Sequence, residues 1–455
     1  MTYTIEKVTT LIGAHRFGTA DANIGFLLTD SRSLCFPKET LFFALKSERH
    51  DGHEFITELY KRGVRNFVVE RVPENYEALF PQTNFLKVES SLIALQRLAE
   101  RHRDEFNIPV VGITGSNGKT MVKEWLYQLL SPSVVVTRSP RSYNSQIGVP
   151  LSVWLLNEQS QVGVFEAGIS EPGEMQALRG IIQPDIAVLT FIGDAHQKNF
   201  SSLEEKCREK VVLFHDTKTI VYCKDDEVVD RVVRSVGYKG ENLAWSMRDR
   251  SAALFVESVE KKGLTSTIHY IYNDEAGEYV LPFIDEASVR NSVTTAVVAL
   301  HLGLSREHLA ERMASLEPVA MRLEVKEGQK GCTLINDSYN SDINSLDIAL
   351  DFMNRRPDHR NRRRTLILSD ILQSGLQPME LYSEVSRLAV ERGVQKFIGI
   401  GPDLCENANC IHVGEQRFFP TVEAFIASEM FKHLHDEVIL LKGARQFGFD
   451  HLTEL

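Results

Sequence analysis

The residues best suited to chemistry stand in one glycine-rich segment, Thr114-Gly115-Ser116-Asn117-Gly118-Lys119-Thr120. An apolar run, residues 110–113, precedes this segment, and residues 121–130 have a helical pattern. Strand, glycine loop and helix are the layout of a phosphate-binding loop, whose backbone N–H groups surround phosphate oxygens at a helix N-terminus. Lys119 would reach the outer phosphates, and the Thr120 hydroxyl would bind Mg²⁺. The residues that we expect at an ATP site are Gly115, Asn117, Gly118, Lys119 and Thr120.

The loop departs from the common phosphate-binding pattern at one position. The pattern Gly-x-x-x-x-Gly-Lys-Ser/Thr places a glycine where this chain has Ile113. A chance glycine-rich turn is the alternative, but the flanking strand and helix patterns favour a nucleotide loop. The short form, Thr-Gly-Ser-Asn-Gly-Lys-Thr, resembles the ATP loop of the Mur ligase family, whose members join amino acids or peptides to a nucleotide-linked sugar in cell-wall synthesis.

Two further candidates follow apolar segments that we expect to be strands. Residues 162–165 end in Glu166, and residues 185–191 lead to His196. Ligands of open parallel sheets bind at the carboxyl ends of the strands, so Glu166 is suited to hold a metal ion; a glutamate facing solvent is the alternative. Mg²⁺ prefers oxygen ligands, so His196 enters only through the resemblance, which implies that a Glu and a His at these two motifs bind Mg²⁺.

A helix predicted to begin after Ser202 carries two candidate lysines. Ser202 and Glu205 have the spacing of a capping box. The resemblance places at Lys210 a lysine that is carbamylated by CO₂, a change that turns an ammonium into a carboxylate-like ligand. Lys206 is the alternative candidate for carbamylation. The other alternative is that Lys210 is an ordinary surface lysine. The expected Mg²⁺ ligands are Thr120, Glu166, His196 and carbamylated Lys210.

The segment before the loop has its own alternation of strand and helix patterns. It contains Asp30-Ser31-Arg32, then Phe42-Phe43-Ala44-Leu45, then Asp51-Gly52-His53. On their chemistry alone, Ser31 and Arg32 could bind a phosphate or cap a turn. The series resembles the N-terminal domain of Mur ligases that act on longer precursors, which holds the UDP end of the substrate, and this favours binding.

Two asparagines are further candidates. Asn144 stands in a polar loop before Ile147-Gly148-Val149-Pro150, where a plain connector is the alternative. The resemblance makes Asn144 a contact of the substrate or of the ATP site. Asn291 lies in a helix that we expect to open at Val289, and could be a helix N-cap. The resemblance instead implies that Asn291 lies against the adenine of ATP.

The last third of the chain carries motifs of the same family. Arg322 resembles the family arginine that meets ATP phosphates. A strand-like run ends in Asp337-Ser338-Tyr339-Asn340, which resembles the branch of the family that adds D-alanyl-D-alanine. Family members usually continue Ala-Asn-Pro, whereas this chain has Ser341-Asp342-Ile343, so the loop geometry is open. We expect Asp337 and Tyr339 at the nucleotide. The residues expected at the peptide substrates are Asn340, Lys442 and Arg445.

Two other features of the last third of the chain are weaker indications of function. The family typically has Gly-Asp-Met-x-Glu-Leu-Gly where this chain has residues 369–375, with Asp370 retained but the Glu absent. The basic run Arg355–Arg364 could suggest nucleic acid, but it precedes an apolar strand pattern, so we expect a solvated loop.

Length and composition agree with a multidomain α/β enzyme. A chain of 455 residues suggests two to four domains. We expect a small UDP-substrate-binding α/β domain in residues 1–105, a central ATP-binding domain with a parallel sheet in residues 106–314, and a Rossmann-like dipeptide-binding domain in residues 315–455. The net charge of −11 disfavours a general nucleic-acid binder. Six scattered cysteines and the lack of an apolar run of about 18 residues favour a cytoplasmic protein without a membrane span.

The resemblance covers nearly the whole chain and implies one reaction. ATP would phosphorylate the carboxylate of UDP-N-acetylmuramoyl-tripeptide, and D-alanyl-D-alanine would attack the acyl phosphate, in peptidoglycan synthesis. The alternatives are the ligase that adds the third amino acid, a folylpolyglutamate-synthetase-like enzyme and an inactive ligase-derived binding module. The chain stops at Leu455 in a helix-like run, so a fused C-terminal alanine racemase domain is a further hypothesis. The expected catalytic residues are Lys119, His196, Lys210 and Arg322.

Overall fold

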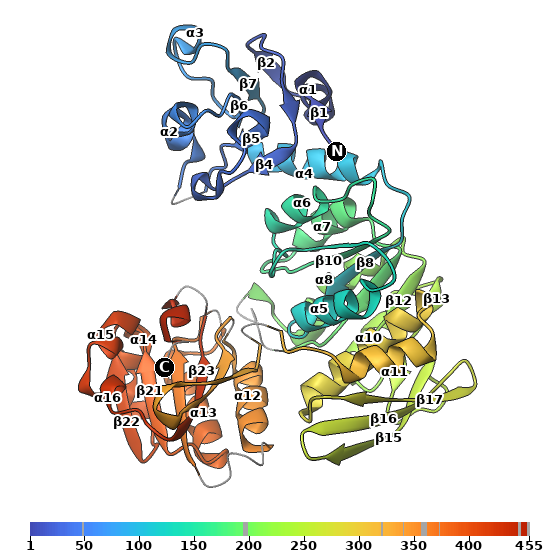
Figure 1. Ribbon diagram of the computed structural model, residues 1–455, viewed down its shortest axis with the longest axis vertical. Coiled ribbons are helices and arrows are strands. Elements are labelled where there is room, and N and C mark those ends of the chain that lie inside the picture. Colours follow the sequence, from blue (N-terminus) through green and yellow to red (C-terminus); the bar gives the residue numbers. More distant parts are fainter. Residues whose placement is uncertain are drawn as a thin grey trace. The chain divides into compact units, whose positions relative to one another are not determined.

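The chain separates into two compact units in a computed structural model (Figure 1). The model describes residues 1–47, 50–193, 199–319, 322–339, 341–355, 362–372, 374–444 and 447–452. The first unit comprises residues 1–112, 133–169 and 173–186, and the second comprises residues 113–132, 170–172 and 187–455. The α/β fold class with parallel sheets is confirmed, and the domain boundaries at 105 and 314 stay predictions.

A five-stranded sheet lies near the start of the first unit, in the order β2-β7-β6-β5-β4. Its strands are β2 (His15–Phe17), β4 (Phe26–Leu28), β5 (Thr40–Phe43), β6 (Asn66–Val69) and β7 (Asn84–Lys87). Only β2 pairs antiparallel. Alternate β5 residues face opposite sides: Leu41 and Phe43 pack with α1 (Ile5–Ile12) and α4 (Ser91–Arg103), and Phe42 packs with α2 (Ile56–Lys61). Smaller elements are β1 (Tyr3–Thr4), β3 (Asn23–Ile24) and α3 (Tyr76–Leu79).

A six-stranded sheet, in the order β13-β12-β11-β8-β10-β9, leads into the glycine loop. Its strands are β8 (Val110–Thr114), β9 (Val136–Arg138), β10 (Val162–Glu166), β11 (Ile186–Leu189), β12 (Thr219–Val221) and β13 (Glu241–Asn242). Every residue of β8, β10, β11 and β12 is buried, as is typical of parallel strands covered on both faces. The helices of this region are α5 (Lys119–Leu130), α6 (Gly148–Val153), α7 (Glu174–Ile182), α8 (Leu203–Val211) and α9 (Glu227–Ser235).

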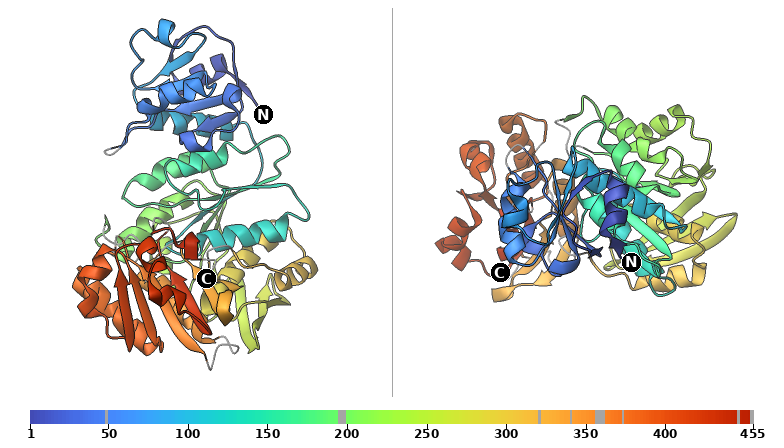
Figure 2. Two further views of the ribbon diagram at one scale, coloured as in Figure 1. Left: turned by 60° about the vertical axis from the view of Figure 1, so that its left-hand side comes forward. Right: turned by 90° about the horizontal axis from the view of Figure 1, so that it is seen from above.

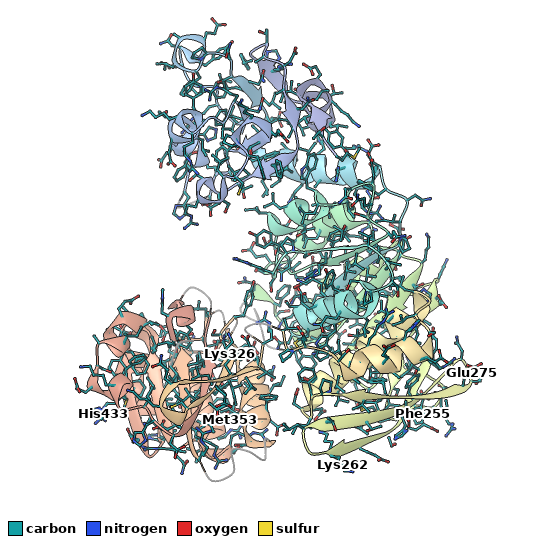
Figure 3. The ribbon with its side chains drawn as sticks, viewed as in Figure 1. Phe255, Lys262, Glu275, Lys326, Met353 and His433 are labelled. Carbon is teal, nitrogen blue, oxygen red and sulfur yellow. The ribbon has the colours of Figure 1, made fainter. Side chains whose placement is uncertain are left out.

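A separate four-stranded sheet follows, in the order β14-β15-β16-β17. Its strands are β14 (Trp245–Ser246), β15 (Leu254–Lys262), β16 (Thr265–Tyr272) and β17 (Glu275–Leu281), and Phe255, Lys262 and Glu275 mark it in Figure 3. Residues 217–285 therefore extend the six-stranded sheet with β12 and β13 and add a β-rich flank. Helices α10 (Glu286–His301) and α11 (Arg306–Ala314) come next.

The C-terminal part is an open α/β sheet, in the order β18-β19-β23-β20-β21-β22. The strands are β18 (Glu324–Glu327), β19 (Thr333–Asp337), β20 (Arg363–Ser369), β21 (Lys396–Ile400), β22 (Glu415–Phe419) and β23 (Glu437–Lys442), and only β18 is antiparallel. Its helices are α12 (Ile343–Arg355), α13 (Pro378–Glu391), α14 (Pro402–Glu406), α15 (Val422–Ile426) and α16 (Glu429–Lys432), which cover both faces (Figure 2). No described helix is long and apolar enough to cross a membrane.

Candidate functional site

Two glycines shape the loop between β8 and α5. Gly115 has φ 144° and Gly118 has φ 88°, values that residues with side chains rarely adopt. A Cβ at Gly115 would lie 2.1 Å from Thr190 Oγ1, and a Cβ at Gly118 would lie 2.5 Å from Asn291 Oδ1. Ile113 is buried in β8, so the glycine missing from the common pattern falls in the strand and not in the loop. Strand, loop and helix lie where the sequence predicts them.

The loop is held closed by the residues that follow β11. The Thr190 hydroxyl donates to the carbonyl oxygen of Asn117 at 2.5 Å. The Ser116 N–H donates to the carbonyl oxygen of Phe191 at 2.6 Å. The Ser116 hydroxyl donates to the Gly193 carbonyl and accepts from the Gly193 N–H, both at 3.0 Å. Sequence reasoning missed these contacts; hydroxyls within the glycine loop and directly after an apolar strand were the available signal.

Lys119 is placed to bind a phosphate. Its Nζ donates to the carbonyl oxygens of Gly115 at 2.6 Å and Ser116 at 3.1 Å, so the ammonium lies over the loop. Thr120 is buried in the first turn of α5. An ammonium beside the N-terminus of a twelve-residue helix provides positive charge and N–H donors for an anion.

Asn291 reaches the loop from α10. This helix begins at Glu286, three residues before the predicted Val289, because the Asp285 carboxylate caps it by accepting the Ser288 N–H at 2.8 Å. The interpretation of Asn291 as a helix N-cap is therefore wrong. The Asn291 side chain lies against Gly118. The structure thus brings one predicted nucleotide contact to the glycine loop.

Both candidate lysines of α8 are buried, so the interpretation as surface lysines is wrong. Ser202 caps this helix as predicted, accepting the Glu205 N–H at 3.1 Å. Lys206 Nζ donates to the carbonyl oxygen of Gly193 at 2.6 Å. Burial lowers the pKa of Lys210 well below its ordinary value, and the charges of Lys119 and Lys206 lower it further. Lys210 is thus a buried amine near the phosphate-loop lysine.

Glu166 is fully buried at the end of β10, so the interpretation as a glutamate facing solvent is wrong. Asn144 Nδ2 donates to Glu166 Oε2 at 3.3 Å. The Asn144 carbonyl also accepts the Gly168 N–H at 2.8 Å, and a Cβ at Gly168 would lie 2.8 Å from the Asn144 side chain. Asn144 and Glu166, both selected from the sequence, are therefore in contact. His196 lies outside the described residues.

Four predicted residues of the C-terminal part form two pairs. The Arg322 guanidinium carbon lies 4.1 Å from the centroid of the Tyr339 ring, which is a cation–π contact. Asp337 and Lys442 end the neighbouring strands β19 and β23, and their side chains form a buried ion pair of 2.7 Å. Each charge of that pair neutralises the other. Asn340 and Arg445 lie outside the described residues.

Two other features of the C-terminal part have structural roles. Asp370 accepts the N–H groups of Asp403 at 3.1 Å and Leu404 at 2.8 Å, and burial raises its pKa. It therefore caps α14 in this altered motif. In the basic run, residues 356–361 lie outside the description. Arg362 donates to Thr333 Oγ1 at 2.8 Å and Arg364 to Asn354 Oδ1 at 2.8 Å, so at least these arginines are held by the fold and are not part of a solvated loop.

The predicted UDP-binding residues lie at a short 3₁₀ turn, Ser31–Ser33. The Asp30 carboxylate caps the turn and forms an ion pair with Arg32 at 2.7 Å, while 88% of the Arg32 side chain is exposed. The Ser31 carbonyl accepts from Arg62 at 2.7 Å. A cavity of about 1840 Å³ elsewhere in the first unit has neither Ser31 nor Arg32 in its lining. The turn offers an accessible guanidinium and hydroxyl, and does not enclose a ligand.

His53, named from the sequence only as part of the Asp-Gly-His motif, has a largely buried side chain in this region. His53 Nδ1 lies 2.6 Å from Asp51 Oδ1, and Nε2 accepts the Glu70 N–H at 3.0 Å. Because Nε2 accepts, Nδ1 carries the proton and donates it to Asp51. The Asp-Gly-His motif therefore ties its own loop to the end of β6.

Comparisons with known proteins agree with this architecture. Residues 113–299 match the Mur ligase middle domain. The chain is 28% identical over 358 residues to a UDP-N-acetylmuramoyl-tripeptide--D-alanyl-D-alanine ligase of Bacillus subtilis (strain 168), an alignment that covers 76% of this chain and 73% of the relative. An Escherichia coli (strain K12) protein of the same name is 23% identical, with 99% and 97% covered.

Solved structures resemble the chain over nearly its whole length. A crystal structure of MurF from Acinetobacter baumannii has a TM-score of 0.83 at 22% identity, covering 99% of this chain and 98% of that one. The Thermotoga maritima MurF ligase, in complex with ADP, has a TM-score of 0.77 at 24% identity, covering 94% and 96%. The chain thus has the fold of these MurF structures, and its residues 113–299, which include the glycine loop, match the Mur ligase middle domain.

Proposed function

We propose that this chain is an ATP-dependent ligase that joins D-alanyl-D-alanine to UDP-N-acetylmuramoyl-tripeptide in the cytoplasm. The observation that carries the proposal is the closed glycine loop, with Lys119 above its carbonyls and Asn291 against Gly118. Relatives bearing this activity as their name align over most of the chain. No finding supports a fused alanine racemase domain.

The residues meet the electrostatic need of this reaction. A substrate carboxylate must approach the γ-phosphate of ATP, and these two anions repel each other. Lys119 and Arg322 would neutralise the phosphate charge, so that a carboxylate oxygen can attack the γ-phosphorus; ADP leaves and an acyl phosphate forms. The D-alanyl-D-alanine amine then attacks the acyl carbon, phosphate leaves, and the amine loses a proton. We propose that Asn340, Lys442 and Arg445 orient the peptide substrates, with Lys442 held in place by Asp337.

The donor set fits a magnesium ion. Glu166 offers a buried carboxylate, Thr120 a hydroxyl, and both are the oxygen ligands that Mg²⁺ prefers. We propose that these two residues, His196 and a carbamate on Lys210 hold the ion, which when bound would neutralise phosphate charge. Within the described ranges, no group of three or more His, Cys, Asp and Glu side chains is gathered.

Lys210 is better suited to carbamylation than Lys206. Only a neutral amine attacks CO₂, forming an N–C bond and releasing one proton, and the environment of Lys210 favours its neutral form. Lys206 instead uses its Nζ to bind the Gly193 carbonyl. The carbamate would also place a negative charge beside the positive charges of Lys119 and Lys206.

Phosphate release from ATP tests the proposed function. With Mg²⁺ and UDP-N-acetylmuramoyl-tripeptide present, we expect phosphate release only when D-alanyl-D-alanine is added. The Lys119→Ala variant should not release phosphate. Lys239→Ala, which removes an exposed lysine of the same unit, is the matched control and should release phosphate like the wild type. Release that needs a single amino acid in place of the dipeptide would instead identify the neighbouring ligase. Ligation that survives Lys119→Ala would reject the ATP site.

A further inference from the structure

The cavity of the first unit lies at the amino ends of parallel strands in the five-stranded sheet. Asn66 begins β6 and Asn84 begins β7, and both line this cavity of about 1840 Å³ together with Thr83. The predicted UDP-binding turn, Ser31–Ser33, instead follows the carboxyl end of β4, which is the end where open parallel sheets usually bind their ligands. The cavity is therefore not the site proposed for the nucleotide-linked substrate.

A row of polar side chains across this end of the sheet leaves one donor unused. Arg16 Nε donates to Asn84 Oδ1 at 3.0 Å, and Asn84 Nδ2 donates to Asn66 Oδ1 at 2.8 Å. Because a guanidinium has only donors, Asn84 must turn its oxygen toward Arg16, and Asn66 must then turn its oxygen toward Asn84. Asn66 Nδ2 is left buried, and among the described residues no acceptor reaches it. The row thus ends in an amide donor whose orientation is fixed.

Thr83 adds a second unused polar group. The residue is 3% exposed, and its Oγ1 has no hydrogen-bond partner within the described part of the chain. Asn66 and Asn84 pair across β6 and β7, and Thr83 directly precedes Asn84, so the two unused groups belong to neighbouring strands about 4.8 Å apart. Buried polar groups without partners destabilise a fold. Two of them on residues that line one cavity indicate a ligand that supplies the missing partners.

Aromatic rings form another part of the lining. Phe36 is 55% exposed and stacks on Phe26 with ring centroids 4.6 Å apart, and Tyr76 and Phe80 also line the cavity. The faces of such rings bind the C–H groups of a ligand. Four acidic and three basic side chains line the cavity, so their charges nearly cancel. An uncharged ligand that combines C–H faces with polar groups fits this lining.

We propose that this cavity binds an N-acetylated oligosaccharide. The carbonyl oxygen of an acetamido group accepts from Asn66 Nδ2, its N–H donates to Thr83 Oγ1, and the C–H face of a sugar ring lies on Phe36. The cavity exceeds the roughly 300–1,000 Å³ of sites for drug-sized molecules, so several sugar units fit better than one. A peptide also contains amides, but extended peptides bind along a strand edge, and this cavity lies at strand ends. The inference does not rest on the proposed ligase function.

Calorimetry on the full chain tests the site with chemically matched probes. The probes are the β-1,4-linked trisaccharide of N-acetylglucosamine, cellotriose, which has the same linkage without acetamido groups, and acetyl-trialanine amide as a peptide. We expect binding of the N-acetylated trisaccharide alone.

Thr83→Val is the decisive variant, because the hydroxyl that it removes bonds nothing in the free protein. The affinity for the N-acetylated trisaccharide should fall about fivefold, while the melting temperature stays the same or rises. Phe36→Leu changes an exposed ring and should weaken the same binding about threefold.

Ser91 supplies a matched control in the same unit. Its hydroxyl is also buried without a hydrogen-bond partner among the described residues, but Ser91 begins α4 and is not part of the cavity lining. Ser91→Ala should therefore leave the affinity for the trisaccharide unchanged. Melting temperatures of every variant establish that the compared proteins are folded.

Four results would overturn the inference. Failure of the N-acetylated trisaccharide to bind, or equal binding of cellotriose, would reject the acetamido site, and binding of the peptide alone would assign the cavity to a peptide. Unchanged trisaccharide affinity in Thr83→Val would leave the unused groups to ordered water. A raised KM for UDP-N-acetylmuramoyl-tripeptide in Thr83→Val would assign the cavity to the substrate of the proposed ligase. A chain that binds the trisaccharide but forms no amide bond would reject the ligase function alone.

Discussion

The Thr190 hydroxyl keeps the nucleotide loop closed, and Thr190→Val removes that hydroxyl while retaining a β-branched side chain. Two acceptors, the carbonyl oxygens of Asn117 at 2.5 Å and Thr114 at 3.2 Å, lie within hydrogen-bond distance of the hydroxyl. A buried hydrogen bond contributes about 1 kcal/mol, and a stranded acceptor adds to the loss, so we estimate about 2 kcal/mol. If the closed conformation of the loop loses the whole of this stabilisation, ATP affinity falls by at most about thirtyfold.

Calorimetric titration with ATP measures this loss, and Thr190→Ser is the matched control because it restores the donor. We expect a loss of about tenfold or more in Thr190→Val and near wild-type affinity in Thr190→Ser. Wild-type affinity in the valine variant would show that the loop stays closed without the hydroxyl. Equal losses in both variants would assign the effect to the packing of the whole side chain and not to the hydrogen bond, and either result refutes the reasoning.

Two further predictions concern buried titratable groups. Burial lowers the pKa of His102 to about 4, against about 6.5 when unfolded, so its contribution to stability is complete above pH 6.5 and is lost as the pH falls, by about 2 kcal/mol at pH 5. The free energy of unfolding of the first unit, measured with urea, should therefore fall less between pH 7 and pH 5 in His102→Gln than in the wild type. An equal fall in both proteins would contradict this. For the carbamate, ¹³C NMR in ¹³CO₂-saturated buffer should show a carbamate signal that Lys210→Arg removes and Lys206→Arg retains, and the opposite pattern would assign it to Lys206.

The His102 prediction depends on a hydrogen-bond arrangement that burial enforces. His102 Nε2 lies 3.0 Å from the Leu156 carbonyl, which can only accept, so Nε2 carries the proton. Nδ1 then accepts from the Tyr3 hydroxyl at 2.8 Å. Protonation of Nδ1 would place a charge in a buried site and require the Tyr3 hydroxyl to turn and accept, which is why the neutral ring is the folded form.

Local patterns were enough to predict the glycine loop, its strand and its helix. A Gly-Lys-Thr turn, an apolar run and a helical run all act over neighbouring residues, so one stretch of sequence carries them. The same holds for Ser202, whose capping contact spans three residues. Lys206 and Lys210 stand one helical turn apart and are both buried, so the pattern names both, and only their different surroundings distinguish them.

Contacts between distant segments could not be predicted in this way. Thr190 lies 76 residues from Thr114 along the chain, and a hydroxyl after an apolar strand has many ordinary roles. Asp337 and Lys442, 105 residues apart, were both selected, but not as partners, because pairing depends on strand order. The start of α10 is different, because its Asp285 cap spans only three residues and is a local signal that the sequence analysis missed.

The position of β23 in the C-terminal sheet has a consequence for biosynthesis. This strand is the last of the sheet to leave the ribosome, yet it lies between β19 and β20. Until residue 442 has emerged, the nascent chain holds β19 and β20 without the strand that joins them, and both expose unpaired backbone edges. The sheet can close only after residue 442 has left the ribosome, when the partner of Asp337 arrives together with its central strand.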